Sequence, residues 1–421
     1  MKYVRRIIDT QLDTMMGLLP AIAIEGAKGV GKTATAKQRT TNVFTLDDEQ
    51  TNEIITGNPD VVAEGTGTVF IDEWQLVPSV WNVVRHAVED GAPVGRFLLA
   101  RSSSPKPKAR VHSGAGRIVR LMMRPMSLPE RGIATTTVSL SSLLAGDTPD
   151  VTGTTEVSLT QYVDEIFRSG FPGIRSAEPA ARPYLLRSYL DRIVSHDVEE
   201  MGVRVLRPAA MLEWLTAYGA ATATTASYAS LLRAATPGQT DKPSKVTADS
   251  YRELLRRLWI LDPVPAWAPG FGHIDRLGQS PKHHLVDPAL AAMTAGVSQE
   301  AIIRGDGPDS PHKTFLGALF ESLAVQTVRV LAEAAGATVH HFRMRGGEHE
   351  VDMIVKRPDH KALAIEVKLS TTVRPADIRD LNWLDNVAPG TLVDKVILNT
   401  GSRAYRRPDG IAVVPLALLG P

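Results

Sequence analysis

The sequence contains no cysteine in its 421 residues. This absence excludes disulfide bonds, thiolate zinc sites, iron–sulfur clusters and a cysteine nucleophile. No apolar run reaches the ~20 residues that span a bilayer, and the opening MKYVRRIIDT carries charge without the apolar core of a signal peptide. These features predict a cytoplasmic protein with no membrane partner.

The sequence also lacks an excess of charge of either sign. Its 47 lysines and arginines balance 46 aspartates and glutamates, which leaves a net charge of +1. The whole chain is therefore not expected to attract nucleic acid, although a single domain could carry a basic face. The length predicts two to four domains, at about 100–200 residues each.

Three domains are expected, in an α/β multidomain protein. Residues 1–134 alternate short apolar strands with helical stretches, which is typical of a doubly wound parallel sheet. The strands are expected at 21–25, 42–46, 68–72, 97–100 and 118–121. Residues 135–300 are expected to form a helical and winged-helix domain, in which helical periodicity dominates from about 159 to 262. The Thr-, Ser- and Gly-rich stretch 135–158 is expected to connect two domains.

Residues 301–421 form the third predicted domain, which begins near the Gly- and Pro-rich GDGPDSPHK. The pattern predicts helices at about 314–335 and 375–387. It predicts strands at 338–344, 350–356, 362–368, 394–399 and 410–415. This order of elements is that of a small mixed α/β domain.

A glycine-rich loop is the strongest chemical signal in the sequence. GAKGVGKT, residues 26–33, fits G-x-x-x-x-G-K-[ST], follows an apolar strand and opens a helix. Gly26, Gly29 and Gly31 would let backbone N–H groups face phosphates. Lys32 would reach the β- and γ-phosphates, and Thr33 would offer its hydroxyl to Mg²⁺. ATP and Mg²⁺ are therefore the predicted cofactors.

The following strands supply residues that such a site needs. In VFIDEW, Asp72 is predicted to hold the metal and Glu73 to act near the attacking water. Ser102, after the strand in GRFLLARSSS, could sense the γ-phosphate, or it could belong to an ordinary serine-rich loop. Arg117 could stabilise charge in this or a neighbouring subunit's site, although exposed arginines are common.

A helix in the middle domain combines an apolar face with a basic one. Apolar residues recur at i, i+3, i+4 and i+7: Tyr251, Leu254, Leu255 and Leu258. The other side carries Arg252, Arg256 and Arg257, which suggests a winged helix-turn-helix that contacts DNA. The alternative is a solvated helix face in a protein-interaction module.

Acidic residues gather in the third domain. A hairpin centred near residue 359 would place Asp352 opposite Glu366, with Lys368 on the same face as Glu366. Such a cluster is costly to desolvate without a cation, which favours a metal site. Asp352 and Glu366 would ligate Mg²⁺, Lys368 would stabilise developing charge, and Glu321 on the preceding helix would support the metal.

These segments resemble a known family in their order along the chain. GAKGVGKT, FIDEWQ, GRFLLARSSS, SPKHHLVDPAL, GALFE, EVDMIV and IEVK are similar to segments of prokaryotic ATP-binding proteins with an AAA-type P-loop domain and a C-terminal domain of unknown function. The C-terminal region is similar to the PD-(D/E)XK, restriction-endonuclease-like nuclease superfamily. That similarity implies Asp352, Glu366 and Lys368 as core residues, with Glu321 on the preceding helix. Members of the ATP-binding family usually have Thr-Gly before the serines that end the strand in GRFLLARSSS, whereas this sequence has Ala100 and Arg101 there.

The sequence thus predicts a Mg²⁺-dependent ATPase fused to a winged-helix domain and a nuclease-like domain, acting on or near DNA. The alternative is a nucleotide-switched, protein-binding regulator whose nuclease fold is catalytically inactive. Under either interpretation, the expected partners of the protein are ATP and either DNA or a protein, and the protein could form an oligomer.

Overall fold

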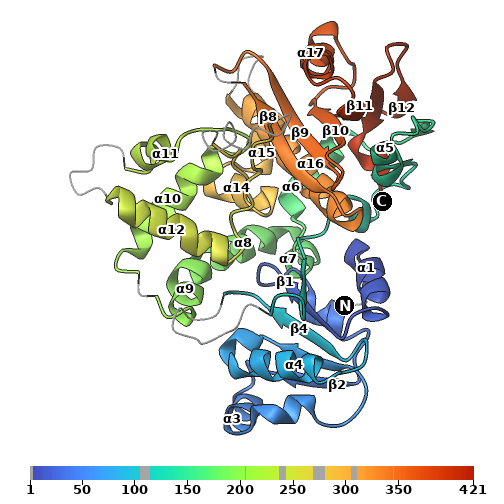
Figure 1. Ribbon diagram of the computed structural model, residues 1–421. Coiled ribbons are helices and arrows are strands. Elements are labelled where there is room, and N and C mark those ends of the chain that lie inside the picture. Colours follow the sequence, from blue (N-terminus) through green and yellow to red (C-terminus); the bar gives the residue numbers. More distant parts are fainter. Residues whose placement is uncertain are drawn as a thin grey trace.

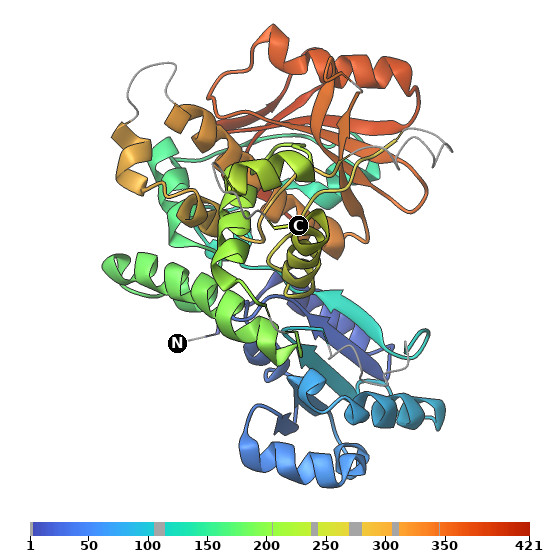
Figure 2. The ribbon, with the colours of Figure 1, turned by 90° about the vertical axis from the view of Figure 1, so that its left-hand side faces the viewer.

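The computed structural model of the protein describes residues 3–104, 114–203, 205–236, 243–268, 280–304, 311–344 and 346–421. Figure 1 shows an N-terminal sheet at the bottom, helices of the middle segment on the left and a second sheet at the upper right. Figure 2, turned by 90°, shows the same three parts packed on one another. One described helical stretch, Thr314–Ala334, is long and apolar enough to cross a membrane, but 67% of its apolar 18-residue window is buried, as in a core helix.

The N-terminal domain is a five-stranded, all-parallel sheet in the order β2-β3-β4-β1-β5. Its strands are β1 (Ala21–Glu25), β2 (Asn42–Thr45), β3 (Val69–Asp72), β4 (Phe97–Arg101) and β5 (Val119–Met122). Its helices are α1 (Ile7–Met16), α2 (Lys32–Ala36), α3 (Glu49–Gly57) and α4 (Ser79–Glu89). Every residue of β1, β3 and β4 is buried, as expected for central strands of a sheet that is covered on both faces. The predicted P-loop-type parallel sheet is confirmed.

The middle segment is helical, as the sequence predicts. Its helices are α6 (Leu159–Arg168), α7 (Pro172–Arg175), α8 (Arg182–Arg192), the π-helix η5 (Ile193–Asp197), α9 (Val198–Glu200), α10 (Pro208–Ala220), α11 (Tyr228–Ala235), α12 (Lys245–Arg257), α14 (Pro288–Thr294) and α15 (Gln299–Arg304). After α12 the chain pairs antiparallel with a later segment, through bridges from Leu261 to Leu285 and from Val264 to Lys282. Whether α10–α12 and this pair form a winged helix stays a prediction.

The C-terminal domain is a mixed sheet beside one long helix, α16 (Pro311–Ala334). Its order is β7-β12-β13-β11-β10-β9-β8, in which β8, β9 and β10 are antiparallel while β10, β11 and β13 are parallel. The strands are β8 (Thr338–Arg343), β9 (Glu350–Lys356), β10 (Ala362–Val367), β11 (Leu392–Asn399), β12 (Arg403–Arg406) and β13 (Ala412–Pro415), with the helix α17 (Arg379–Val387) before β11.

The stretch 135–158, expected to connect two domains, is instead part of the C-terminal body. It contains β6 (Val138–Ser139), α5 (Leu140–Ala145) and β7 (Gly153–Thr154). The strand β7 pairs with β12, and β6 pairs with β14 (Leu419–Gly420). The physical reason is the apolar face of α5, whose three leucines are buried beside β10, β11 and α16.

Candidate functional site

The loop between β1 and α2, residues 26–33, depends on three glycines. Gly26, Gly29 and Gly31 have φ angles of 154°, 83° and 109°, which residues with a side chain rarely adopt. A Cβ atom on Gly26 would lie 2.1 Å from the carbonyl oxygen of Met123. Only glycine therefore fits where this loop packs against the segment that follows β5.

Lys32 begins α2 and lies across this loop. Its Nζ atom donates hydrogen bonds to the carbonyl oxygens of Gly26 (2.8 Å) and Ala27 (3.0 Å). Burial lowers the pKa of Lys32 to about 8, although the carboxylates of Glu73 and Asp72 oppose that shift. The lysine therefore interacts with the two acidic residues at the carboxyl end of β3.

Thr33 and Asp72 meet at the carboxyl end of β3. The Thr33 hydroxyl donates a 2.7 Å hydrogen bond to Oδ2 of Asp72. The other oxygen, Oδ1, is buried and has no hydrogen-bond partner among the described residues. Burial raises the pKa of Asp72 to about 6. A hydroxyl beside a carboxylate with an unused oxygen is a donor set that fits Mg²⁺.

Glu73 follows directly and has a left-handed backbone, with φ 54°. Its Oε2 atom accepts a 2.6 Å hydrogen bond from the hydroxyl of Ser102 and a 3.2 Å bond from the Ser102 N–H. The Gln75 side-chain amide donates to the same oxygen. Ser102, which the sequence suggests as a phosphate sensor, thus hydrogen-bonds to Glu73 in this structure.

In the C-terminal domain, the residues expected to form a metal site lie close together. Met353 of β9 lies opposite Ile365 of β10, so the next residues along the two strands are Asp352 and Glu366. Oδ2 of Asp352 accepts a 2.9 Å hydrogen bond from the Val367 N–H. Lys368 lies 2.6 Å from Oε1 of Glu366. The predicted hairpin register is therefore the one observed, although its use as a metal site stays a prediction.

A lysine that the sequence reasoning missed occupies the centre of this group. The Nζ atom of Lys282 lies 2.9 Å from Oε1 of Glu321, 2.9 Å from Oε1 of Glu350 and 2.9 Å from Oδ1 of Asp352. The Lys282 side chain is 1% exposed. We call Glu321, Glu350, Asp352 and Glu366 the carboxylate cluster.

Burial and mutual repulsion set the protonation of this cluster. Burial first, and then the charge of Asp352, raises the pKa of both Glu321 and Glu366 to about 8. Burial would also raise the pKa of Asp352, but Lys282 and Lys368 outweigh it and hold that pKa below its usual value. The pKa of Lys282 is well above its usual value, because the carboxylates outweigh its burial.

Residues 19–131 match the family described as an AAA domain. Residues 159–301 and 316–419 match two domains of unknown function, DUF8612 and DUF4143 respectively. No curated protein matches the chain. The AAA match and the parallel sheet support a P-loop ATPase, whereas a nuclease likeness of the C-terminal domain is not among these findings.

Solved structures with partial similarity include a Walker-type ATPase of Pyrococcus abyssi. It is 14% identical, covers 68% of this chain and 94% of its own, and has a TM-score of 0.41. A mutant of RuvB from Thermotoga maritima is 16% identical over 62% of this chain and 88% of its own, with a TM-score of 0.26.

Arg117 lies away from the nucleotide loop of its own AAA domain. It precedes β5 and pairs with Glu89 at the end of α4, with 3.2 Å between Nε and Oε1. Both residues therefore lie near the amino ends of the parallel strands, whereas residues 26–33 follow the carboxyl end of β1. The predicted role of Arg117 in this or a neighbouring subunit's site stays a prediction.

Arg101 links the AAA domain to the middle helices. It pairs with Glu25 at 2.7 Å. Its guanidinium lies 5.6 Å from the Trp74 ring centroid and 5.1 Å from that of Trp259. Trp74 follows Glu73 directly, so this contact joins the end of α12 to the vicinity of Glu73.

A cavity of about 520 Å³ adjoins the nucleotide loop. The N-terminal segment, α2 and the region around α7 line it, with Tyr3, Arg6, Gly31, Gln38, Met126 and Pro172 among the lining residues. The guanidinium of Arg6 donates a 2.9 Å hydrogen bond to the carbonyl oxygen of Val30. The cavity therefore opens beside the loop, between the AAA domain and the middle segment.

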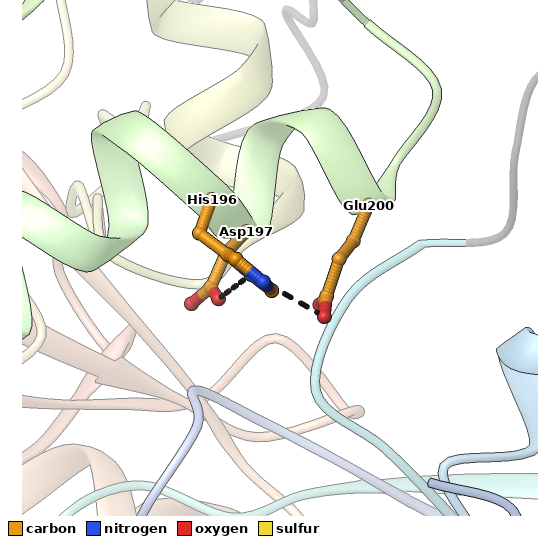
Figure 3. A group of neighbouring side chains, drawn as sticks. All are labelled: His196, Asp197 and Glu200. Carbon is orange, nitrogen blue, oxygen red and sulfur yellow. Dashed lines mark ion pairs between the residues drawn. The ribbon is translucent and has the colours of Figure 1, made fainter. Parts of the chain in front are cut away.

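The middle segment also contacts the loop through η5. Figure 3 shows His196, Asp197 and Glu200, whose ligand-type atoms lie within 4.8 Å of one another, the only such trio in the described residues. Asp197 lies 3.3 Å from Nζ of Lys28 in the loop, and Tyr189 donates a 3.0 Å hydrogen bond to the Lys28 carbonyl. Because Asp197 already pairs with Lys28 and the other two side chains are exposed, we interpret this trio as part of the contact to the loop.

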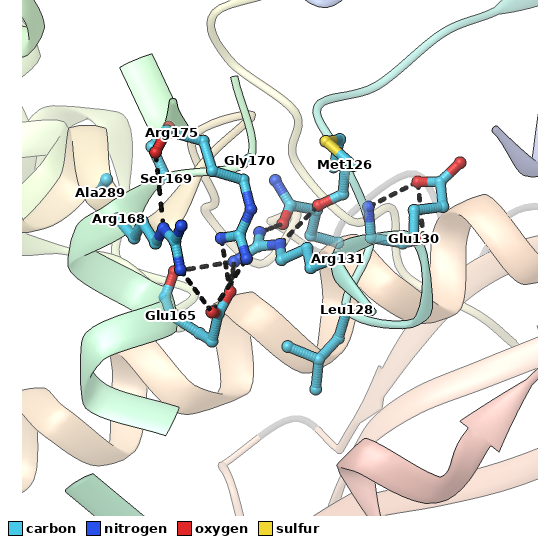
Figure 4. Close-up of polar contacts among 12 residues, drawn as sticks. Met126, Leu128, Glu130, Arg131, Glu165, Arg168, Ser169, Gly170, Arg175 and Ala289 are labelled. Carbon is cyan, nitrogen blue, oxygen red and sulfur yellow. Dashed lines mark hydrogen bonds and ion pairs between the residues drawn. The ribbon is translucent and has the colours of Figure 1, made fainter. Parts of the chain in front are cut away.

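Buried charges fix the three parts together. Figure 4 shows Glu165 of α6 between Arg131 and Arg175. Arg175 pairs with Glu165 at 2.6 Å, and Arg131 donates a 2.7 Å hydrogen bond to the Glu165 carbonyl and another to Gln326 of α16. Burial alone would raise the pKa of Glu165, but the two arginines lower it. The segment after β5 therefore touches the middle and C-terminal parts at once.

The three arginines expected to contact DNA have different surroundings. Arg252 lies 4.2 Å from the Tyr228 ring centroid and 3.1 Å from Oδ1 of Asp249. Arg256 is exposed. Burial, and to a smaller extent the charges of Arg120 and Arg257, lowers the pKa of Arg101. Arg257 therefore lies within electrostatic reach of Arg101, and of the three arginines only Arg256 is fully exposed.

Proposed function

We propose that the chain is a Mg²⁺-dependent ATPase whose AAA domain uses the bound nucleotide to control the middle helices and the C-terminal domain. The observation that supports this most is the meeting of Lys32, the Thr33–Asp72 pair and Glu73 at one edge of the sheet. These are a cation for phosphates, a donor set for Mg²⁺ and a carboxylate that can activate water.

Each residue then has a distinct role. Lys32 exchanges the carbonyl oxygens of Gly26 and Ala27 for phosphate oxygens. Thr33 and Asp72 would hold Mg²⁺, which supplies positive charge against the phosphates. Glu73 takes a proton from the attacking water, and Ser102 fixes the direction of its carboxylate.

The cavity of about 520 Å³ is the proposed place for the base of the nucleotide. It adjoins the loop, and both α2 and the region around α7 line it. A nucleotide there would touch the AAA domain and the middle segment together. Binding would thereby favour one arrangement of the two parts over another.

Two outputs of this switch can be tested. Action on DNA would use the α12 arginines and a catalytic C-terminal domain. A nucleotide-switched regulator would use the C-terminal domain for binding only. The position of Lys282 within the carboxylate cluster favours the second output, because it pairs with residues that a nuclease would need for metal.

The test of the ATPase proposal is turnover by the full chain with Mg²⁺. Lys32→Ala should abolish nucleotide binding or hydrolysis, and Glu73→Gln should keep binding while turnover falls by about 10²–10⁴-fold. The matched control is Lys37→Ala, an exposed lysine one turn further along. Unchanged turnover in Lys32→Ala would refute the assignment.

A further inference from the structure

We propose that the ammonium group of Lys282 is the resident cation of the carboxylate cluster. The C-terminal domain then takes up no Mg²⁺ or Mn²⁺ while Lys282 is in place, and removing this side chain opens a divalent-cation site. The inference does not depend on ATP hydrolysis, because it concerns a different domain.

The first argument is the pairing of the ammonium group. Lys282 Nζ donates hydrogen bonds of 2.9 Å to Oε1 of Glu321 and Oδ1 of Asp352, and it forms an ion pair with Oε1 of Glu350, also at 2.9 Å. The side chain is almost fully buried. A charge in such a position is retained only when it is paired, so this arrangement satisfies the lysine and relieves repulsion among the carboxylates.

The second argument is that the ligands which a metal needs are already in use. Oδ1 of Asp352 faces Lys282, and Oδ2 accepts the Val367 N–H. Oε1 of Glu366 pairs with Lys368, although its Oε2 is buried with no hydrogen-bond partner among the described residues. Mg²⁺ bound to Asp352 would have to lie close to the Lys282 ammonium, and a buried pair of cations repel each other strongly.

The third argument is the spacing of the oxygens. Mg²⁺ holds its ligands at 2.0–2.1 Å, whereas an ammonium holds them near 2.9 Å and spreads them further apart. In the described part of the chain, three ligand-type atoms lie within 4.8 Å of one another only at His196, Asp197 and Glu200. The carboxylates around Lys282 are therefore spaced for the ammonium.

The backbone holds Lys282 in this position. Its N–H donates a 2.9 Å hydrogen bond to the carbonyl oxygen of Val264, and its own carbonyl accepts one from the Val264 N–H. The pair that follows α12 thus presents the lysine, while α16 and β9 carry the three carboxylates. The lysine cannot leave the cluster without disturbing this pairing or folding its side chain away from the carboxylates.

Charge balance indicates what removing the lysine would do. Three cationic groups, the ammonium groups of Lys282 and Lys368 and the guanidinium of Arg343, pair with the four carboxyl groups of the cluster. Without Lys282, only Lys368 and Arg343 would face all four. A divalent cation bound in the place of the Lys282 ammonium would then offset the excess negative charge, with Asp352 and Glu321 as its nearest oxygen ligands.

The experiment measures the response of the full chain to Mn²⁺ without nucleotide. All proteins also carry Asp72→Asn, so that the nucleotide site does not contribute. With Lys282 present, Mn²⁺ should leave the melting temperature where EDTA leaves it. In Lys282→Ala, Mn²⁺ at about 100 times its dissociation constant should raise the melting temperature by roughly 5 °C or more. Adding Asp352→Asn should abolish that increase.

The surface variant Lys361→Ala is the matched control, because Lys361 lies in the turn between β9 and β10, where its Nζ donates a hydrogen bond to the carbonyl oxygen of Gly390 and not to the carboxylate cluster. It should behave as the protein with Lys282 does. Mn²⁺ binding that requires Asp352 while Lys282 is present would overturn the proposal. A folded Lys282→Ala that binds no Mn²⁺ would overturn it as well.

Where Lys282→Ala does not fold, Lys282→Gln replaces it, since glutamine keeps donors without the charge. Should neither variant fold, Mn²⁺ binding to the protein that keeps Lys282 tests the proposal by itself. Isothermal titration that finds a Mn²⁺ site lost in Asp352→Asn contradicts the proposal, and titration that finds none supports it. The failure of ATP hydrolysis would leave each of these readouts unaffected.

Discussion

The hydroxyl of Ser102 donates a 2.6 Å hydrogen bond to Oε2 of Glu73. The serine lies after β4 and the glutamate after β3, so the bond links the ends of two neighbouring strands. Glu73 is the proposed base, and Ser102 orients its carboxylate. We therefore predict that Ser102 is a positioning residue.

Ser102→Ala should lower kcat by about tenfold and leave KM nearly unchanged, because it removes an orienting bond from Glu73 and not a contact with nucleotide. Ser102→Thr keeps the hydroxyl and should restore most of kcat. Steady-state kinetics of both variants, with Ser104→Ala as the neighbouring control, measure the effect. A rise in KM at constant kcat would instead assign Ser102 to nucleotide binding.

Arg101 should couple the AAA domain to the middle helices through two aromatic rings. Arg101→Lys keeps a charge for Glu25 but loses the planar group that lies over Trp74 and Trp259. In a double-mutant cycle with Trp259→Leu, the two substitutions should be non-additive by about 0.5–2 kcal/mol in unfolding free energy. Arg117→Lys with the same tryptophan variant should be additive. Additivity for Arg101 would mean that the contact carries no coupling.

The sequence predicts the AAA domain well because local and tertiary signals agree there. Each buried parallel strand is a continuous apolar run, and the glycine pattern of residues 26–33 has few structural alternatives. The short strand β12 was missed, because RAYR offers almost no apolar alternation. The place of α5 on the C-terminal sheet was also missed, because a short amphipathic helix does not indicate which surface covers it.

The candidate sites, too, could be predicted from the sequence only in part. The register of β9 and β10 follows from the hairpin spacing, so Asp352 and Glu366 could be paired from the sequence alone. Lys282 comes from a segment 70 residues before Asp352, and only the tertiary fold brings the two together. One signal was available: a lysine in the otherwise weakly charged KHHLV, a stretch with β-like composition. Such a lysine requires a buried partner.

DNA binding, if the middle segment provides it, should depend mostly on Arg256. Arg252 contacts Tyr228 and Asp249, and Arg257 lies near Arg101. Arg256→Ala alone should then reduce the slope of log affinity against log salt by about 0.9, the value for one phosphate contact. Replacing all three arginines should add little. A titration of duplex DNA at several salt concentrations measures this, and an unchanged slope would favour the protein-binding face.

Asp262 is the residue from which we predict a dependence of stability on pH. It lies between Arg124 of the AAA domain, at 2.8 Å, and Arg329 of α16, at 2.9 Å. Burial would raise the pKa of Asp262, but the two arginines outweigh it and lower the pKa to about 2. Because the folded pKa lies below the unfolded one, the carboxylate stabilises the fold above about pH 4. This stabilisation is lost as the pH falls toward 2.

The lowering of the pKa from 3.8 to about 2 corresponds to about 2.5 kcal/mol at neutral pH, of which about 1 kcal/mol should be lost between pH 5 and pH 3. Asp262→Asn cannot titrate, so the difference in unfolding free energy between it and the unmodified protein should shrink by that amount over the same range. Urea unfolding at the two pH values measures the difference, with the exposed Asp60→Asn as control. A difference that stays constant with pH would show that Asp262 does not hold the three parts together through its charge, because the arginines act only on the ionised carboxylate.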